Sequence, residues 1–188
     1  MGLSVENQPP TLVVMGVSGV GKTTVARLLA ERLDLPYAEA DDFHPLANIA
    51  KMAAGTPLDD LDRQPWLHAL ADWLGGQVAH GAGGVVACSA LKRRYRDLLR
   101  SQAPATRFLH LTGDQALIRA RLAERSGHFM PASLLDSQFA ALEPLQPDEP
   151  GAAMDVTHSP SELARRAALL FAPRYAPAHP RPVNGDFA

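Results

Sequence analysis

Short apolar runs alternate with amphipathic segments along this chain. Residues 11–17 form an apolar, β-branched run that ends among glycines, which is typical of a buried parallel strand. From residue 22 to residue 33, apolar side chains recur at the spacing of one helix face. A strand, a glycine loop and a helix in this order predict the first unit of a parallel α/β fold.

The rest of the chain repeats this alternation. Asp114 and Ser159 can cap the helices that follow them, and Pro65 can open a helix after an acidic loop at 59–63. Strands are expected near 35–38, 85–88, 107–111 and 152–157, and helices near 45–54, 65–78, 90–102, 114–125, 133–142 and 160–171.

This order favours a three-layer α/β/α sandwich with a parallel sheet. Right-handed crossovers place the loops that follow the strands at one edge of such a sheet, where ligands bind. We expect one domain at 11–171, a disordered lead at 1–10, and a flexible tail at 172–188 that is rich in proline and histidine.

Composition narrows the function classes. Hydrophobic residues make up 46% of the 188 residues and charged residues 20%, which is typical of a globular protein. The 18 basic and 20 acidic residues give a net charge of −2, so no electrostatic footprint for nucleic acid or an anionic membrane is present. No apolar stretch is long enough to span a membrane, and a single cysteine excludes an internal disulfide. These features favour a cytoplasmic protein.

The loop after the first strand matches the phosphate-binding motif G-x-x-x-x-G-K-T. Its glycines let successive backbone N–H groups point at phosphate oxygens, and the following helix adds the positive end of its dipole. Lys22 is expected to reach the β- and γ-phosphates of ATP, and the Thr23 hydroxyl to bind Mg²⁺. The predicted nucleotide-binding residues are Gly16, Val17, Ser18, Gly19, Val20, Gly21, Lys22, Thr23 and Thr24.

Other sequence motifs besides the phosphate loop decide which class of phosphate-binding protein this is. A GTPase needs an Asn-Lys-x-Asp sequence, which the chain lacks, and a motor or transporter ATPase needs a strand that ends in acidic residues. The strand at 85–88 is instead followed by Ser89. A small chain with a lysine–threonine loop points to a kinase of a small molecule.

An acidic turn at 39–42 follows the second predicted strand, at the same sheet edge as the phosphate loop. A kinase can use such carboxylates to order Mg²⁺ and to accept the proton of the attacking hydroxyl. A solvated acidic turn is the alternative. Downstream, Arg63 could pair with neighbouring aspartates or hold a substrate carboxylate, and Trp66 is expected to pack in the core.

The run at 41–66 resembles the gluconate kinases in the pattern D-D-F-H-P-x-x-N-x-x-K-M-x-x-G-x-P-L-x-D-x-D-R-x-P-W. The similarity continues through 88–97 and 127–129 and covers about 11–171. Members of that family resemble shikimate and nucleoside monophosphate kinases in fold. The resemblance implies transfer of the γ-phosphoryl group of ATP to the 6-hydroxyl of D-gluconate, by a homodimer.

The resemblance also implies residue roles. Asp41 would be the catalytic base and a substrate ligand, and the other predicted substrate ligands are His44, Lys51, Arg63, Lys92 and His128. The family commonly has Asp-Gly-Asp at this turn, whereas this chain has Glu39-Ala40-Asp41. Glu39 is the second expected Mg²⁺ residue, although its side chain reaches one methylene further than aspartate.

A lid is expected at about 121–142. Arg121 and Arg125 lie four residues apart on one predicted helix face and would stabilise the charge on the transferring phosphoryl group. His128 follows a Ser-Gly break that would let the segment close and exclude water. A solvated basic helix end is the alternative interpretation.

Two other functions remain open at this point. A kinase of another small acid or alcohol, such as shikimate, would lack the runs at 41–45 and 51–58. A regulatory nucleotide-binding module that has lost catalysis would bind ATP without releasing ADP when an acceptor is added.

Overall fold

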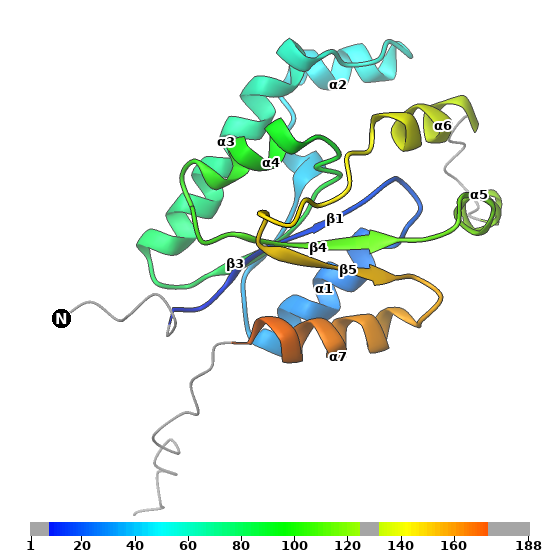
Figure 1. Ribbon diagram of the computed structural model, residues 1–188. Coiled ribbons are helices and arrows are strands. Elements are labelled where there is room, and N and C mark those ends of the chain that lie inside the picture. The colour runs from blue at the N-terminus through cyan, green and yellow to red at the C-terminus, as the bar shows by residue number, and fades with distance from the viewer. Residues whose placement is uncertain (1–7, 125–131, 173–188) are drawn as a thin grey trace, which may run out of the picture.

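Five parallel strands form the central sheet of this protein (Figure 1). The computed structural model describes residues 8–124 and 132–172, apart from the side chains of 132–134. The strands lie in the order β2-β3-β1-β4-β5, so β1 is at the centre and β2 is at one edge. Their bounds are β1 Thr11–Met15, β2 Tyr37–Glu39, β3 Gly84–Ala87, β4 Arg107–Thr112 and β5 Gly151–Asp155.

The helices connect these strands on both faces of the sheet (Figure 1). Their bounds are α1 Lys22–Leu33, α2 Leu46–Ala53, α3 Asp60–Ala79, α4 Arg93–Arg100, α5 Gln115–Ala123, α6 Ala132–Ala141 and α7 Pro160–Phe171, with a 3₁₀ turn η2 at Ala40–Phe43. Within the described ranges, no helix is both long and apolar enough to span a bilayer.

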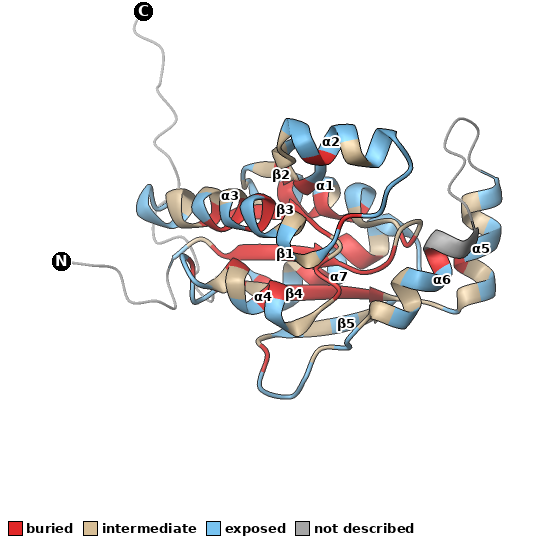
Figure 2. Cartoon of the chain, turned by 90° about the horizontal axis from the view of Figure 1, so that it is seen from above, coloured by how far each residue is buried: buried red, intermediate tan, exposed pale blue. Residues whose placement is uncertain are grey.

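The alternation of side chains along β1 explains the layers. Leu12 and Val14 point to one face, where they join the core cluster that includes α1 and α7. Val13 and Met15 point to the other face and join the cluster that includes α3 and α4. Since β1 is covered on both faces, all five of its residues are buried (Figure 2). The expected three-layer α/β/α sandwich with a parallel sheet is confirmed.

The predicted start of the third helix was wrong. The acidic segment 59–63 was expected to be a loop before a helix that opens at Pro65, but α3 begins at Asp60 and contains Pro65 in its second turn. Asp59 and Asp62 form a capping box, in which each side chain accepts a hydrogen bond from the other's backbone N–H at 2.8 Å. This reciprocal cap fixes the first turn five residues earlier than the proline predicted.

The caps expected at Asp114 and Ser159 are present. The Asp114 carboxylate accepts from Ala116 N at 2.8 Å, and Ser159 Oγ accepts from Glu162 N at 3.3 Å. The helix expected at 90–102 is shorter than predicted, because Lys92 has an extended backbone and α4 begins only at Arg93. Lys92 therefore lies in the loop between β3 and α4 and not inside the helix.

Candidate active site

The carboxyl ends of β1, β2 and β3 bring three loops together at one edge of the sheet. The phosphate loop follows β1, the turn η2 follows β2, and the segment 88–92 follows β3. Gly16 N donates to Ser89 O at 3.2 Å, so the first and third of these loops are joined by a backbone hydrogen bond. This convergence follows from the parallel sheet and was predicted from the sequence.

Two glycines of the phosphate loop have both a left-handed backbone and no room for a side chain. Gly16 has φ 139°, and a Cβ there would lie 2.7 Å from Leu111 O. Gly19 has φ 81°, and a Cβ there would lie 2.4 Å from Leu122 of α5. The loop is therefore pressed against β4 and α5, and only glycine fits at these two positions.

Lys22 and Thr23 begin α1 directly after this loop. Lys22 Nζ donates to Val17 O at 3.0 Å, which holds the ammonium over the loop. Thr23 Oγ1 donates to Glu39 Oε2 at 2.8 Å. The structure thus joins the two residues predicted to serve the metal, although they are 16 positions apart.

Tyr37 orients Glu39 from the other end of β2. Its hydroxyl donates to the same oxygen, Glu39 Oε2, at 2.6 Å. Burial and the hydrogen bond to Glu39 raise the pKa of Tyr37 to about 12, so the phenol stays protonated and remains a donor. The guanidinium of Arg27 lies over the Tyr37 ring at 5.3 Å. The longer reach of Glu39 is therefore fixed by a tyrosine that sequence reasoning did not single out.

Asp41 lies in η2, two residues beyond Glu39, and its side chain is exposed. The charges of Lys22, Asp41 and Glu39 all act on the buried thiol of Cys88, which places them around the end of β3. Burial, as the largest cause, raises the pKa of this thiol to about 12. Cys88 is therefore an inert thiol, and Asp41 is an exposed carboxylate at this edge of the sheet.

His44 is stacked on Trp66 with ring centroids 4.5 Å apart and an interplanar angle of 12°. Trp66 is buried in the core as expected, and its Nε1 donates to Ala40 O at 2.6 Å. Burial, aided by the charge of Arg63 and opposed by Asp41, lowers the pKa of His44. The imidazole is consequently neutral at pH 7 and fixed in orientation next to the acidic turn.

The cations predicted for the substrate differ in their partners. Lys51 Nζ forms an ion pair with Asp62 at 2.6 Å, and this hydrogen bond raises the pKa of Lys51 and lowers that of Asp62. Arg63 is half-buried and makes no ion pair with any described residue. Of the two alternatives for Arg63, pairing with the neighbouring aspartates is therefore not what the described residues show.

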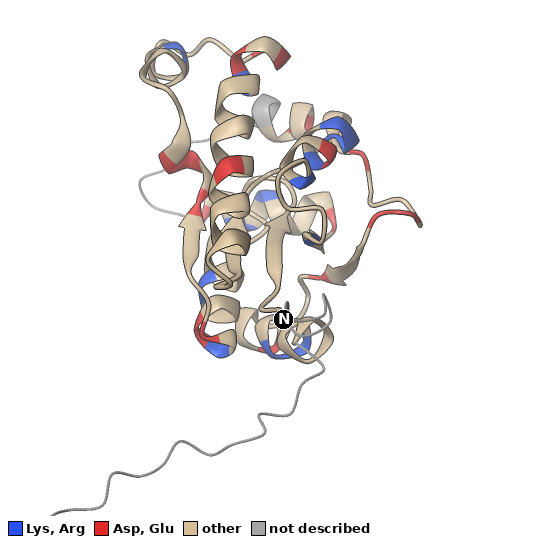
Figure 3. Cartoon of the chain, turned by 90° about the vertical axis from the view of Figure 1, so that its left-hand side faces the viewer, with Lys and Arg blue, Asp and Glu red and all other residues tan. Residues whose placement is uncertain are grey.

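Lys92 belongs to a cluster centred on Asp60 at the start of α3. Its Nζ lies 3.3 Å from Asp60 Oδ1, and the same carboxylate accepts from Tyr95 Oη and Arg94 Nη2 of α4. The hydrogen bond from Tyr95, followed by the two cations, lowers the pKa of Asp60 to about 2. The cluster therefore joins α3 to α4. Figure 3 shows that acidic and basic residues are interspersed over the face in view.

The predicted lid residues are only partly described. Arg121 Nη2 donates to Val156 O at 2.8 Å, which ties the end of α5 to the loop after β5. Arg125 and His128 lie outside the described residues. α6 reaches the phosphate loop through Gln138, whose Oε1 accepts from Ser18 N at 2.7 Å. Sequence reasoning missed Gln138 and Asp60 because their partners lie at least 32 positions away, and it missed Tyr37 although the alternation of a strand places Tyr37 and Glu39 on one face.

The residues near the end of β2 fit a magnesium ion. Mg²⁺ prefers hard oxygen ligands and is usually held by one or two side chains together with phosphate oxygens and water. The Thr23 hydroxyl and the Glu39 carboxylate supply such oxygens beside the phosphate cradle. In the described part of the chain, no group of three His, Cys, Asp or Glu side chains could hold a metal ion by itself.

Comparisons with known proteins agree with this geometry. A family model described as an AAA domain matches residues 12–145. A gluconokinase of Gluconobacter oxydans is 53% identical over 143 residues, which are 76% of this chain and 80% of that protein. The crystal structure of a gluconokinase from Sinorhizobium meliloti is 42% identical with a TM-score of 0.79, and the match covers 88% of this chain and 95% of that one.

A shikimate kinase structure from Bacteroides thetaiotaomicron extends the likeness at the level of the fold. It is 15% identical with a TM-score of 0.61, and the match covers 86% of this chain and 97% of that one. The expected resemblance of the fold to shikimate kinases is thereby confirmed. The phosphate loop, the strand order and the identities above lead to one conclusion: this chain belongs to the gluconokinase family of P-loop kinases.

Proposed function

We propose that this protein transfers the γ-phosphoryl group of ATP to the 6-hydroxyl of D-gluconate, giving 6-phospho-D-gluconate and ADP. The observation that carries the proposal is the end of β2, which holds Glu39 against Thr23 of the phosphate loop and presents Asp41 two residues later. One short segment thus joins the nucleotide half of the site to the acceptor half. The gluconokinase relatives supply the substrate.

In this reaction, the gluconate 6-oxygen forms a bond to the γ-phosphorus as the bond to the β,γ-bridging oxygen breaks. The hydroxyl proton passes to the Asp41 carboxylate, and the bridging oxygen leaves as part of ADP. Lys22 and the loop N–H groups hold the phosphates in line with the acceptor. Most of the rate enhancement then comes from positioning and from charge stabilisation.

Mg²⁺ would be held by Thr23 with Glu39 nearby, and it would neutralise charge on the β- and γ-phosphate oxygens. Tyr37 supports this arrangement because its hydroxyl keeps Glu39 Oε2 directed at Thr23. The longer glutamate side chain is thereby fixed where the family commonly has aspartate.

Three cations are proposed to recognise the acceptor. Arg63 makes no ion pair with the described residues and can offer two parallel N–H groups to the gluconate carboxylate. Lys51 and Lys92 are each paired with one aspartate, so they would contribute hydrogen bonds to hydroxyl groups. His44, held on Trp66, completes this side of the pocket.

We also propose that 121–142 acts as a lid that carries Arg121, Arg125 and His128 to the phosphoryl group, for which Arg121 has to leave its hydrogen bond to Val156 O. The contact of α6 with the phosphate loop supports this assignment, since it brings the segment to the nucleotide site. The lead 1–10 and the tail 172–188 remain outside the kinase domain in this proposal. We further propose that the protein is cytoplasmic and that it forms a homodimer. Light scattering on a size-exclusion column would test the dimer.

The test is an assay of ADP release with ATP and Mg²⁺, comparing D-gluconate with shikimate, glucose and no acceptor. Gluconate alone should support release, and ³¹P NMR should show a phosphate monoester at the 6-position. The Lys22→Ala variant should lose turnover while keeping its circular dichroism spectrum. Release with shikimate in place of gluconate would contradict the substrate, and ATP binding without ADP release on any acceptor would favour a regulatory module.

A further inference from the structure

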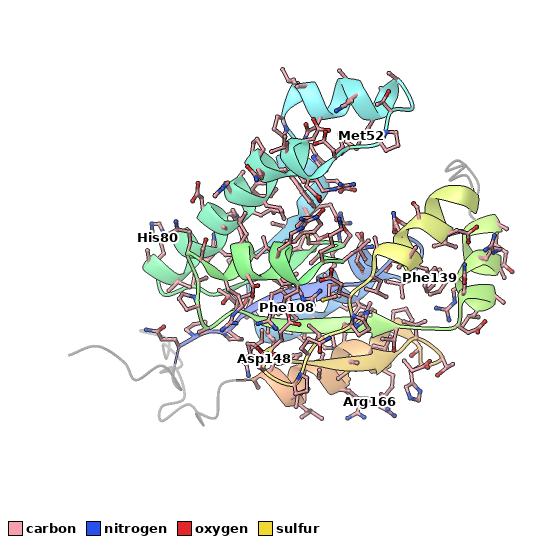
Figure 4. The ribbon with its side chains drawn as sticks, turned by 45° about the horizontal axis from the view of Figure 1, so that its top comes forward. Met52, His80, Phe108, Phe139, Asp148 and Arg166 are labelled. Atoms are coloured by element: carbon pink, nitrogen blue, oxygen red, sulfur yellow. The ribbon has the colours of Figure 1, made fainter. Side chains whose placement is uncertain are left out.

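Helix α2 is attached to the domain through a buried amide. Asn48 is 5% exposed, whereas Leu46 and Ile49 of the same helix are 85% and 47% exposed. Asn48 Nδ2 donates to Asp62 O at 2.7 Å, which joins α2 to the first turn of α3. Figure 4 shows α2, where Met52 is labelled, next to this end of α3. It costs free energy to bury a polar side chain unless it is hydrogen-bonded, so the partners of Asn48 indicate what its amide does.

The carbonyl of Asp62 decides which atom of the Asn48 amide faces His44. A carbonyl oxygen only accepts hydrogen bonds, so the amide atom beside Asp62 O is the nitrogen. The same nitrogen lies 3.4 Å from His44 Nδ1. An amide nitrogen carries two protons and can donate to both partners, but it cannot accept. His44 Nδ1 is therefore the acceptor, and an accepting imidazole nitrogen carries no proton.

Trp66 and Asn48 together fix the orientation of the His44 ring. The stacked contact with Trp66, at 4.5 Å and 12°, fixes the plane of the imidazole. Stacking alone would also allow the ring turned over by a half rotation, which would place a C–H group where Nδ1 now lies. The contact with the Asn48 amide selects the observed orientation, because only a ring nitrogen can accept its proton. The proton of neutral His44 is then on Nε2, which has no hydrogen-bond partner among the described residues.

The groups around His44 favour its neutral form. Burial lowers the pKa of His44, Asp41 of η2 raises it, and Arg63 of α3 lowers it, with a decrease as the result. On α2, the cation Lys51 is engaged in its own ion pair, and Asn48 is an uncharged donor. Protonation of the ring would set an Nδ1–H group against this donor, so the amide contact also opposes the charged form.

We propose that Asn48 is a positioning residue that holds His44 as the neutral tautomer with its proton on Nε2, so that His44 offers one N–H donor to an oxygen of the acceptor. The inference rests on the proposed function in that His44 lies on the acceptor side of the site. It adds the direction of the hydrogen bond, since the acceptor binds His44 through a lone pair of a hydroxyl or carboxylate oxygen. An acceptor with a protonated amine at that place would set a second donor against Nε2–H and would bind less well.

The first test reads the tautomer directly by ¹⁵N NMR of the histidine rings, on the full chain at neutral pH without substrate. The spectrum of His44→Gln assigns the His44 signals by their disappearance. In the unaltered chain, Nδ1 of His44 should have the chemical shift of an unprotonated ring nitrogen and Nε2 that of a protonated one. A proton on Nδ1 would overturn the proposal.

The second test reverses the polarity of the contact with Asn48→Asp. A carboxylate accepts from Nδ1–H, so the pKa of His44 should rise by about one unit or more, and above that pKa the proton of the neutral ring should move to Nδ1. Nε2 then accepts in place of donating. The KM for gluconate should therefore rise about three- to tenfold as the pH is raised from about 6 to 9, while the KM for ATP follows that of the unaltered chain. Ala47→Asp is the matched control, because it places the same charge at an exposed position of α2.

The two tests separate a positioning role from a purely structural one. An Asn48→Asp variant in which Nδ1 stays unprotonated, or in which the pH profile of the gluconate KM follows that of Ala47→Asp, would overturn the proposal. The NMR measurement on the unaltered chain requires no substitution at Asn48, so it decides even where Asn48→Asp does not fold. It also requires no substrate. A chain that releases no ADP with gluconate would therefore overturn the proposed function and leave the assignment of the tautomer to be decided by the spectrum.

Discussion

Asp41 and Asp42 are neighbouring exposed carboxylates in the turn η2, and the proposed mechanism uses only Asp41. The electrostatic influence of Asp41 on His44 and on Cys88 places it at the end of β3, beside Lys22 and Glu39. This position supports the proposed role of Asp41 over that of Asp42.

Substitution of each aspartate by asparagine tests the difference between Asp41 and Asp42. Asp41→Asn should lower kcat by about 10²- to 10⁴-fold, because the amide cannot accept the hydroxyl proton, while the Kd for ADP should change less than about threefold. Steady-state kinetics and calorimetry measure the two quantities. The control is Asp42→Asn, which should retain most of the activity. Equal losses of turnover and nucleotide affinity in Asp41→Asn would instead indicate a structural role.

At the scale of elements, α4 is fixed to the segment before β5 by a buried ion pair. Arg96 is fully buried, and its guanidinium binds Glu149 through two parallel hydrogen bonds of 2.5 and 2.8 Å. Arg96 Nη1 also donates to the carbonyls of Ala90, Leu91 and Glu143, so both protons of this nitrogen have acceptors. The pair holds the loop after β3, which carries Lys92, in its place beside Asp60.

Breaking this pair should destabilise the whole domain. Glu149→Ala leaves the Arg96 charge buried without its counter-ion, so the free energy of unfolding should fall by about 3–5 kcal/mol in urea titrations. Asp148→Ala is the control, since Asp148 pairs with Arg93 at the exposed surface and should have a much smaller effect. Similar losses in the two variants would contradict the distinction between the buried pair and the exposed one.

The elements also show what local sequence can and cannot predict. The sheet, its strand-following loops and the phosphate cradle were predicted because each depends on short patterns such as the apolar run at 11–17 and its glycines. The predicted start of α3 was wrong because Pro65 was given more weight than the capping box of Asp59 and Asp62. The Gln138–Ser18 pair, which spans 120 positions, depends on how α6 packs, and no local pattern encodes that packing.

For the whole molecule, one buried histidine sets a pH dependence. His110 in β4 is 3% exposed, and within the described residues its Nε2 has no hydrogen-bond partner. Burial, together with the charge of Arg96, lowers the pKa of His110 to about 4 from 6.5. The folded state therefore binds this proton less readily than the unfolded chain does.

The corresponding stability is fully present above pH 6.5 and is lost as the pH falls towards 4. From these two pKa values, the free energy of unfolding should decrease by about 2 kcal/mol between pH 7 and pH 5 on account of His110. Urea titrations at several pH values measure this slope. His110→Leu should remove that part of the slope whatever its stability at pH 7, and an unchanged slope would assign the effect to other groups.

The nucleotide side of the site follows a central strand, whereas the acceptor side follows an edge strand. The two sides therefore differ in how far their sequences can change without disturbing the core. β1 and its phosphate loop lie at the centre of the molecule, where Gly16 and Gly19 are pressed against β4 and α5. β2 is a three-residue edge strand that pairs only with β3 in the described sheet, and the turn η2 and helix α2 that follow it are mostly exposed. New acceptors can therefore arise by rebuilding an edge strand and a peripheral helix, while a change in the handling of the nucleotide would require remaking the core. The architecture thus leaves the acceptor side open to change while it constrains the side that binds the phosphate donor.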